Sequence, residues 1–422
     1  MPVAPDTPAT LAAFVAELSP DVVGVHLKTL EVRRAYDLVA PLASLGVPLI
    51  AGGPHATVRP LEPLRHGFDL VVTGEAEDSL PALLDHLEDP ARVDGVSFVD
   101  RGIHRHRPRA RASRDLDALP DPHAALDAFF PEHYGADDTL APGGLLSSRG
   151  CPAACTFCSN AVTGRRFRYH SAARVAAEAK VLRDRFDTSA FCYLDDSFAV
   201  GRRRMNEVCD ALEALGGIQW TCTAHPAHLH RDILFRMRAA GCTGIDIGLE
   251  SVHADRLRDI GKGLTVERAL AVLRDCAELG LHTVVNLMVG WPDETEAELA
   301  DMLEFIEAVS PIAGAFNARG VLVPHPGTPE YELHHERAGF TDWWLHETLP
   351  YEPFPAAWDP VEVVRAYAAD AALDRNFFGH DEAHLESMRE VLCAKAHHTF
   401  AKVIARSTAA DAPHWVAAAG AR

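Results

Sequence analysis

The sequence lacks an excess of basic residues. Its 422 residues include 40 Lys and Arg against 60 Asp and Glu, which gives a net charge of -20. A surface that binds nucleic acid needs clustered positive charge. We therefore expect no nucleic-acid partner. The acidity is typical of a protein that stays soluble, and it also favours cationic over anionic substrates.

The sequence also lacks a long apolar run and a targeting segment. No stretch reaches the about 18 consecutive apolar residues that span a bilayer. The first 20 residues contain Pro, Asp and Glu, and they have no basic start of the kind found in signal peptides. We expect a cytoplasmic protein without a membrane partner.

Cysteine is scarce outside one short stretch. Nine cysteines in a chain of this length, without a targeting segment, indicate reduced thiols rather than disulfides. Three of them, Cys151, Cys155 and Cys158, lie close together in "CPAACTFC". The other six are dispersed and are typical of small buried hydrophobic residues: Cys192, Cys209, Cys222, Cys242, Cys276 and Cys393.

Two series of alternating strands and helices predict an α/β fold. In residues 1–103, Val-rich stretches alternate with helical patterns, which is typical of a parallel, doubly wound, Rossmann-like sheet. Residues 104–142 are basic and then rich in Asp and Pro, and we interpret them as a linker. Residues 143–335 hold six more strand-length stretches, which predict a partial (β/α)6 barrel similar to a TIM barrel. Residues 336–422 are expected to be mainly helical.

Three cysteines on one loop can converge on one metal centre. A structural zinc site normally takes four protein ligands, and the nearest downstream histidine, His170, is twelve residues beyond Cys158. Thiolates are the usual ligands of iron–sulfur clusters. We therefore expect Cys151, Cys155 and Cys158 to hold a [4Fe-4S] cluster with one open iron. They follow the first barrel strand, at the end where barrel active sites lie.

The C-x3-C-x2-C loop after the first strand of a six-strand series resembles the radical S-adenosylmethionine (SAM) superfamily. The resemblance covers about residues 143–335. It implies that SAM binds the open iron through its amino and carboxylate groups. An electron from an external donor, such as a flavodoxin or ferredoxin, then cleaves SAM. The products would be methionine and a 5′-deoxyadenosyl radical, which abstracts hydrogen from a small-molecule substrate.

The same resemblance assigns several residues to the binding of SAM. Phe157, between the second and third cysteines, matches the aromatic residue that contacts the adenine. Val289 and Gly290, in "NLMVGWPDET", match the segment of the fifth strand near the adenine. A glycine at that position lets the backbone approach the ring.

Carboxylates at two strand ends complete the expected SAM site. Asp195 and Asp196, in "YLDDSF", are expected to accept hydrogen bonds from the ammonium group of SAM. The alternative for them is a helix N-cap. Glu250, in "GIDIGLES", matches the ribose-binding acid of the family, and its alternative is a buried pair with Lys262.

The N-terminal residues resemble the cobalamin-binding domain that precedes the barrel in one subclass of the superfamily. The stretches that carry the resemblance are "PDVVGVHL", "LIAGGPHAT" and "DLVVTGEAEDSL". A βαβ unit with the central strand is absent before Thr10, and no D-x-H-x-x-G motif occurs. We therefore expect a truncated domain, residues 1–103, that covers one side of the barrel and binds no cobalamin. His55 is interpreted as a loop residue rather than a cobalt ligand.

Polar residues on the barrel strands are candidates for holding the substrate. Strand alternation places Tyr193 on the same face as Asp195, and its phenol can donate a proton to a leaving hydroxyl. The alternative is a core tyrosine whose hydroxyl bonds to backbone. His225, Asn286 and Arg319 are further candidates for substrate contacts. Asn286 lies in an apolar strand, so its amide needs a partner.

The favoured reaction is dehydration of a 1,2-diol in an aminoglycoside such as paromamine, a step of antibiotic biosynthesis. A separate nicotinamide-dependent reductase would act on the product. The hypothesis depends on the short N-terminal domain, on an Ala- and Arg-rich composition and on the negative charge, which suits a polycationic sugar. Two alternatives remain open: a cobalamin-dependent radical SAM methyltransferase and a non-catalytic iron–sulfur module.

Overall fold

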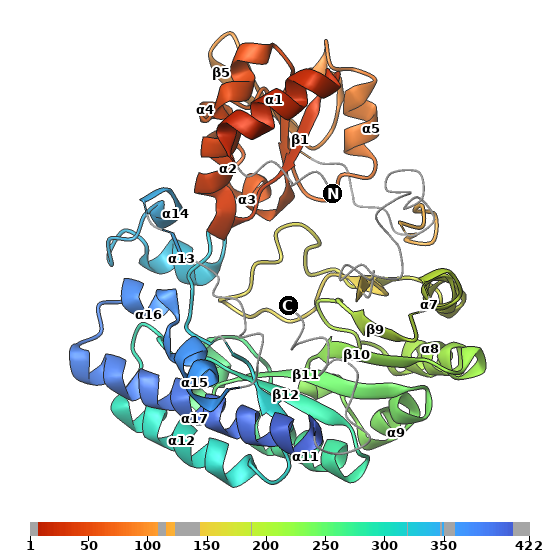
Figure 1. Ribbon diagram of the computed structural model, residues 1–422, viewed down its shortest axis with the longest axis vertical. Coiled ribbons are helices and arrows are strands. Elements are labelled where there is room, and N and C mark those ends of the chain that lie inside the picture. The colour runs from red at the N-terminus through yellow and green to blue at the C-terminus, as the bar shows by residue number, and fades with distance from the viewer. Residues whose placement is uncertain are drawn as a thin grey trace. The chain divides into compact units, whose positions relative to one another are not determined.

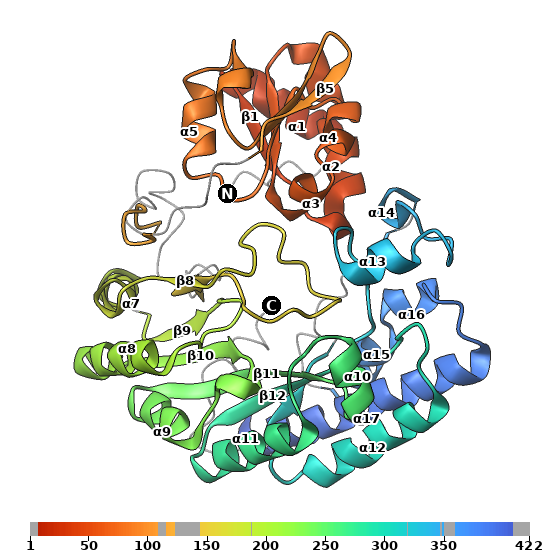
Figure 2. The same ribbon diagram turned by 180° about the vertical axis from the view of Figure 1, so that it is seen from behind.

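The computed structural model describes residues 7–108, 115–122, 144–186, 188–318, 320–346, 348–349 and 359–407. The chain divides into two compact units, whose elements are labelled in Figures 1 and 2. Unit 1 consists of Met1–Arg114, Phe157–Gly164 and Pro324–Pro350, and unit 2 consists of Asp115–Thr156, Arg165–Val323 and Tyr351–Arg422. Two segments far from the N-terminus in the sequence therefore belong to the N-terminal unit.

Unit 1 is built on a five-stranded sheet with the order β1-β2-β3-β4-β5. The first three strands are parallel, and the last two are antiparallel. The parallel part confirms the parallel α/β sheet that the sequence predicts, but the strands lie in sequence order without a reversal, so the sheet is not doubly wound. The strands are β1 (Val23–His26), β2 (Leu49–Gly52), β3 (Leu70–Val72), β4 (Val96–Asp100) and β5 (Ile103–His106). Their buried core includes Ile50, Leu70, Val72, Leu83, Val93 and Val96.

The helices of unit 1 come from both ends of its sequence. α1 begins with a reciprocal capping box between Thr7 and Thr10, and Pro8 occupies its first turn. The fully buried Trp343 donates from Nε1 to the Pro324 carbonyl at 3.0 Å. The helices are α1 (Pro8–Leu18), α2 (Val32–Val39), α3 (Gly53–Val58), α4 (Leu61–Arg65), α5 (Ser79–Leu84), α13 (Pro329–His334) and α14 (Trp343–His346).

Unit 2 contains a six-stranded parallel sheet with the order β13-β12-β11-β10-β9-β6. In the described ranges no pairing joins β13 to β6, so the sheet is open. An open sheet is consistent with the partial barrel that the sequence predicts. The strands are β6 (Gly144–Leu145), β9 (Ala190–Tyr193), β10 (Gln219–Ala224), β11 (Cys242–Glu250), β12 (His282–Leu287) and β13 (Ala315–Phe316), and a hairpin of β7 (Ser148–Arg149) and β8 (Arg168–Tyr169) follows β6.

Helices follow the strands of unit 2 and cover the outer face of its curved sheet (Figures 1 and 2). This alternation confirms the predicted α/β class. Apolar residues at helical spacing form the contact with the sheet, as Met205, Val208 and Leu212 do on α8. The helices are α7 (Ala172–Phe186), α8 (Arg202–Leu215), α9 (Arg231–Ala239), α10 (Ala254–Asp259), α11 (Val266–Glu278) and α12 (Glu296–Val309).

The predicted C-terminal helices are α15 (Pro360–Ala368), α16 (Ala371–Arg375) and α17 (Glu382–Ser407). α17 packs along α12 and β13, and both ribbon views show α17 beside α12. The Phe316 N–H donates to Thr399 Oγ1 at 2.9 Å, and Lys395 Nζ donates to the Leu287 carbonyl at 3.1 Å. Burial lowers the pKa of Lys395 to about 7. The C-terminal helix therefore reaches the carboxyl end of β12.

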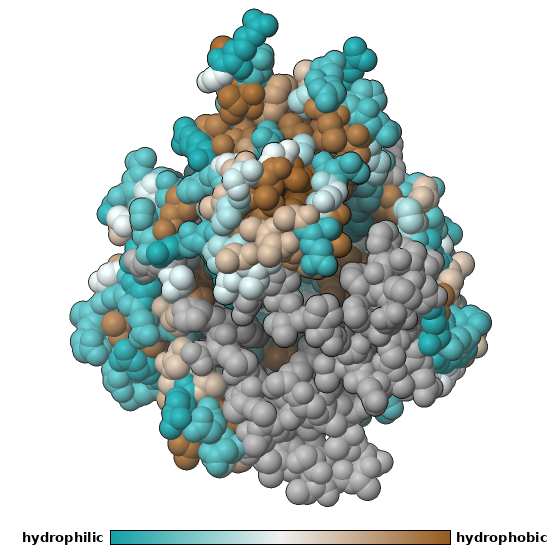
Figure 3. All heavy atoms as spheres, turned by 45° about the horizontal axis from the view of Figure 1, so that its top comes forward, coloured by the Kyte–Doolittle hydropathy of each residue, from teal (hydrophilic) through white to brown (hydrophobic). Residues whose placement is uncertain are grey.

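No helix in the described part of the chain is both long and apolar enough to cross a membrane. On the face drawn in Figure 3, hydrophobic residues form small groups among hydrophilic ones. Scattered exposed apolar side chains of this kind are normal on a folded protein.

Candidate functional site

The cysteine loop connects β7 to β8. Cys155 is buried, Cys151 is partly exposed and Cys158 is exposed. The loop contacts the turn after α10, where the Thr156 N–H donates to the Ile260 carbonyl at 3.0 Å. Gly261 has φ +66, and a Cβ there would lie 2.8 Å from the Ala154 carbonyl oxygen, so this turn requires glycine.

The donor set of the loop fits an iron–sulfur cluster. Three thiolates with the spacing of Cys151, Cys155 and Cys158 are the ligands that such a cluster prefers. Among the residues with described positions, no group of three or more His, Cys, Asp or Glu side chains is arranged as a metal site. The joint ligation by the three cysteines, and the contact of Phe157 with adenine, therefore stay predictions.

Asp195 is a structural residue rather than the predicted SAM ligand. Its carboxylate is buried and accepts hydrogen bonds from Ser147 N at 2.7 Å, Ser147 Oγ at 2.5 Å and Ser148 Oγ at 2.6 Å. Arg204 Nη2 lies 3.8 Å from Asp195 Oδ2. Because these donors occupy both oxygens, Asp195 fastens the end of β9 to the segment that enters the cysteine loop.

Asp196 lies on the opposite side of the same strand end and is exposed. Its Oδ2 accepts the N–H of Gly150 at 3.0 Å, directly before Cys151. Asp196 therefore holds the start of the cysteine loop. Its predicted contact with the ammonium group of SAM stays a prediction.

Tyr193 does not face the predicted substrate space. Its ring packs against Phe198 and Trp220 at centroid distances of 4.8 and 5.6 Å. Burial raises its pKa, and the charged neighbours include Glu178 of α7 and Arg204 of α8. Tyr193 shares a face with Asp195, as predicted, but that face packs against helices. The predicted proton donation to a leaving group is therefore wrong.

The hydroxyl of Tyr193 is also unusual because it is buried and has no hydrogen-bond partner among the described residues. We expect Tyr193→Phe to keep full activity and to raise the free energy of unfolding by up to about 1 kcal/mol, since an unbonded buried hydroxyl is destabilising. Denaturant unfolding and SAM turnover of both proteins check this. A Tyr193→Phe protein that folds but loses turnover would restore a catalytic role for the phenol.

Asn286 has its partner on the neighbouring strand. Its Nδ2 donates to Asp246 Oδ1 at 2.7 Å. Thr223 pairs with Asp246 in the register of β10 and β11. These partly exposed side chains alternate with residues that are buried against the helices, so they form a polar group on the face away from the helices. Burial raises the pKa of Asp246.

Two other predicted substrate contacts have different outcomes. His225 Nδ1 accepts the N–H of Ala227 at 3.2 Å, and its Nε2 lies 2.8 Å from the Lys262 carbonyl. Burial lowers the pKa of His225 to about 4, so the ring is neutral and Nε2 donates. His225 is thus a helix cap rather than a substrate ligand. Arg319 lies outside the described residues.

Glu250 forms the pair with Lys262 that the sequence left as an alternative. Lys262 Nζ donates to Glu250 Oε1 at 3.0 Å. Glu250 has φ 71, a left-handed conformation that a non-glycine residue seldom adopts and that often marks a functional site. A Cβ on Gly248 would lie 2.6 Å from Glu250 Oε1, so glycine makes room for the pair. The contact of Glu250 with ribose stays a prediction.

The segment after β12 is held at both ends. Val289 N donates to the Gly320 carbonyl at 2.7 Å, which links it to the segment after β13. Gly290 has φ +84, and its N–H donates to Glu294 Oε2 at 2.8 Å. Glu294 and its partner His384 were missed in the sequence, because the partners are ninety residues apart.

Two family matches cover most of the two series of strands. Residues 145–306 match the radical SAM superfamily. This match identifies residues 145–306 as a radical SAM domain. Residues 2–84 match the B12 binding domain. The radical SAM domain therefore contains the three cysteines, Asp195 and Asp196, and Glu250. It ends within α12.

Known proteins are similar to this chain over most of its length. The chain is 28% identical to an uncharacterised methyltransferase of Pyrococcus horikoshii, over 80% of this chain and 75% of that protein. The radical SAM methyltransferase TsrM from Kitasatospora setae, solved with cobalamin and a [4Fe-4S] cluster bound, has a TM-score of 0.62 at 18% identity, over 79% of this chain and 70% of that one.

A second solved structure has the same fold. The cobalamin-dependent radical SAM enzyme OxsB, solved with aqua-cobalamin bound, has a TM-score of 0.62 at 19% identity over 79% of this chain. The chain spans about half of OxsB, 49% of its length. Other curated relatives are named as methyltransferases or cyclases.

The match of residues 2–84 overturns the expectation that the N-terminal domain binds no cobalamin. Its lack of a D-x-H-x-x-G motif does not remove it from the B12-binding family. His55, which we interpreted as a loop residue, lies in α3 and is fully buried. Its ring nitrogens are 3.1 Å from Thr29 Oγ1 and 2.9 Å from Glu62 Oε1, so His55 has no free nitrogen for a cobalt ion.

Proposed function

We propose that the protein is a cobalamin-dependent radical SAM enzyme that transfers a methyl group from SAM to a small-molecule substrate. The observation that carries the proposal is the presence, in one chain, of a B12-binding match at residues 2–84 and a radical SAM match at residues 145–306. The names of the methyltransferase relatives support it. This replaces dehydration of an aminoglycoside as the favoured reaction.

The cysteine loop would supply the radical SAM part of the chemistry. Cys151, Cys155 and Cys158 would hold a [4Fe-4S] cluster whose open iron binds SAM. Asp196 would keep the loop in place through its bond to Gly150. An external one-electron donor would reduce the cluster.

The B12-binding part would use the carboxyl ends of the parallel strands in unit 1. Ligands of open α/β sheets bind at this edge. The backbone turns there at Gly53, which has φ +93, and at Gly74, which has φ +73. Gly53 has to be glycine, because a Cβ there would lie 2.8 Å from the His26 ring and 2.9 Å from the Leu27 carbonyl oxygen. Such close backbone packing at this edge would suit a flat corrin ring. When bound, cobalamin supplies a cobalt centre that accepts a methyl group and passes it on.

The substrate would lie against the polar group on the open face of unit 2. Asp246 and Asn286 offer an acceptor and a donor within 2.7 Å of each other. Thr223 lies beside them in the register. Such a set suits a small polar molecule with hydroxyl or amino groups.

Product analysis tests the proposal. The protein is reconstituted anaerobically with iron, sulfide and hydroxocobalamin, desalted, and incubated with SAM and a reductant. We expect about one retained cobalamin per chain and release of S-adenosylhomocysteine. Absence of retained cobalamin, with 5′-deoxyadenosine as the SAM product, would contradict methyl transfer and favour hydrogen abstraction without cobalamin.

A further inference from the structure

A buried carboxylate closes the turn between β12 and α12. Glu294 Oε2 accepts the Gly290 N–H at 2.8 Å, and the side chain of Glu294 is 2% exposed. The turn is tightly packed, because Trp291 is buried and donates from Nε1 to the Met288 carbonyl at 3.2 Å. The position of the Gly290 backbone therefore depends on where the Glu294 carboxylate lies.

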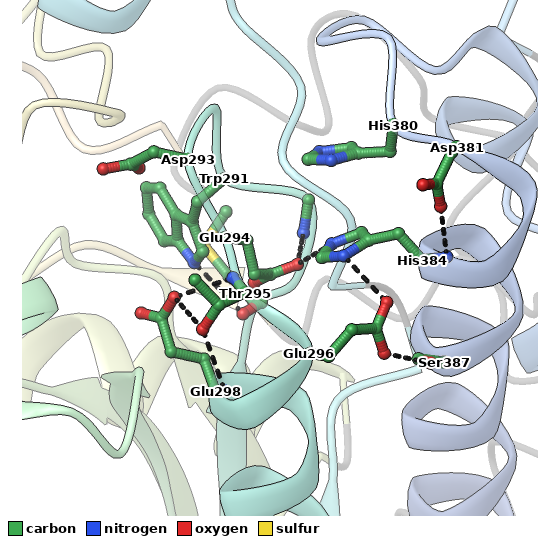
Figure 4. Close-up of polar contacts among 12 residues, drawn as sticks. Trp291, Asp293, Glu294, Thr295, Glu296, Glu298, His380, Asp381, His384 and Ser387 are labelled. Carbon is green, nitrogen blue, oxygen red and sulfur yellow. Dashed lines mark hydrogen bonds and ion pairs between the residues drawn. The ribbon is translucent and has the colours of Figure 1, made fainter.

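The first turn of α17 determines where that carboxylate lies. Figure 4 shows His384 between two acidic side chains, with one ring nitrogen directed at each. His384 Nε2 is 3.2 Å from Glu294 Oε2, and Nδ1 is 3.2 Å from Glu296 Oε1. A carboxylate accepts and does not donate when ionised, so two such contacts require a hydrogen on both ring nitrogens. The arrangement thus fits a charged imidazolium.

The surroundings keep His384 in place. Its backbone N–H donates to Asp381 Oδ1 at 2.9 Å, at the start of α17. Its ring stacks on that of His380 at a centroid distance of 4.3 Å. Ser387 Oγ donates to Glu296 Oε2 at 2.5 Å, which orients the second carboxylate.

The charges around His384 favour its proton. The carboxylates of Glu294 and Glu296 contact its ring, and the Asp381 carboxylate accepts its backbone N–H. The His380 ring stacks on the His384 ring. The hydrogen bond to Glu294 raises the pKa of His384 above its usual 6.5. Burial raises the pKa of Glu294, and the contacts with His384 and the Gly290 N–H act in the opposite direction. Glu298 adds negative charge nearby. Arg256 of α10 pairs with Glu298 and Asp293 instead.

We propose that His384 is a positioning residue for SAM, which acts through the Glu294 carboxylate on the Gly290 backbone. The inference rests on the proposed function, which includes SAM binding, and on the predicted place of Val289 and Gly290 near the adenine of SAM. The first turn of α17 would thereby contribute to the SAM site through Glu294 and the Gly290 backbone. When His384 loses its proton, the ring becomes neutral and keeps only one N–H donor. Glu294 then has no charged partner, and the Gly290 backbone that it holds is no longer fixed.

The test measures the dissociation constant of SAM between pH 6 and pH 9 by equilibrium dialysis, with cluster- and cobalamin-loaded protein. In the wild type we expect affinity to fall as pH rises through the pKa of His384, because the charged form is lost in that direction. In His384→Gln we expect affinity about tenfold lower at pH 6.5, a change of about 1.4 kcal/mol, and no dependence on pH in this range.

Two controls separate positioning from general damage. His397→Gln changes an exposed histidine of the same helix and should bind SAM as the wild type does. Glu296→Gln changes a half-exposed partner and keeps the bond to Glu294, so it should move the pH midpoint of SAM binding downward without loss at pH 6. The rate of SAM cleavage at saturating SAM should stay the same in His397→Gln.

Equal SAM affinity of wild type and His384→Gln at every pH would overturn the inference, as would an unchanged midpoint in Glu296→Gln. The measurement on Glu296→Gln tests the inference even if His384→Gln folds poorly. A failure of the proposed function has a different signature: SAM binds with the expected pH dependence, but no cobalamin is retained and no methyl group is transferred.

Discussion

Cys155→Ala is expected to lose the absorption of the iron–sulfur cluster and to cleave SAM at least about 1,000-fold more slowly than the wild type, since a [4Fe-4S] cluster with two protein ligands is not retained. Cys155 is buried, and burial raises the pKa of its thiol, so only an iron ion nearby would keep it as a thiolate. Iron content, the visible spectrum and 5′-deoxyadenosine or S-adenosylhomocysteine release measure the effect after anaerobic reconstitution.

Cys393→Ala is the matched control for this loss. Cys393 is a partly exposed thiol of α17, far from the cysteine loop in sequence. The variant should retain iron and cleave SAM as the wild type does. Iron retained in Cys155→Ala, or iron lost in Cys393→Ala, would contradict the assignment of the cluster to residues 151–158.

Asp195→Ala is expected to lower the free energy of unfolding by about 3 to 5 kcal/mol. The substitution leaves Ser147 N and two serine hydroxyls buried without their acceptor, and it removes the negative charge that lies 3.8 Å from the buried Arg204 guanidinium. Unpaired buried donors are strongly destabilising, and an unpaired buried charge more so. Denaturant unfolding of the two proteins at neutral pH gives the difference.

The neighbouring aspartate provides the comparison. Asp196 is exposed and its Oδ2 accepts the Gly150 N–H, a bond that the amide oxygen of asparagine can also accept, so Asp196→Asn should lower the free energy of unfolding by less than about 1 kcal/mol. It should weaken SAM binding if the predicted ammonium contact exists. A similar decrease in the free energy of unfolding in Asp195→Ala and Asp196→Asn would show that the hydrogen bonds of Asp195 do not stabilise the fold as expected.

The architecture was largely predictable because local patterns determine it. Alternation of strand-length apolar stretches with helical periodicity predicted both sheets, and the cysteines predicted the loop that follows β7. Whether the sheet closes into a barrel was not predictable in the same way. It depends on pairing between the first and last strands, which are far apart in the sequence and do not pair in the described residues.

Side-chain direction was the main source of error at the site. A period of two places Tyr193 and Asp195 on one face but does not say which face packs against helices. The answer comes from Arg204 on α8, which pairs with Asp195. His225 was likewise assigned from its place at a strand end, whereas its ring caps the turn that follows.

Residues that depend on distant partners were missed. Asp246 interrupts an apolar strand just as Asn286 does, so the same argument that singled out the amide also applied to the carboxylate. The contact of Glu294 with His384 joins two segments ninety residues apart, and no local pattern indicates it.

The expectation about cobalamin failed for another reason. It rested on what the sequence does not contain, a βαβ unit before Thr10 and one short motif, rather than on residues that are present. The stretches that are present, including the strands β1 to β3, match the B12 binding domain.

The release of S-adenosylhomocysteine tests the central claim most directly. Protein loaded with the cluster is incubated with SAM and a reductant in the presence and absence of hydroxocobalamin, and the SAM products are quantified by mass spectrometry. We predict S-adenosylhomocysteine only when cobalamin is present and the three cysteines are intact. Formation of 5′-deoxyadenosine alone, in equal amounts with and without cobalamin, would contradict the account.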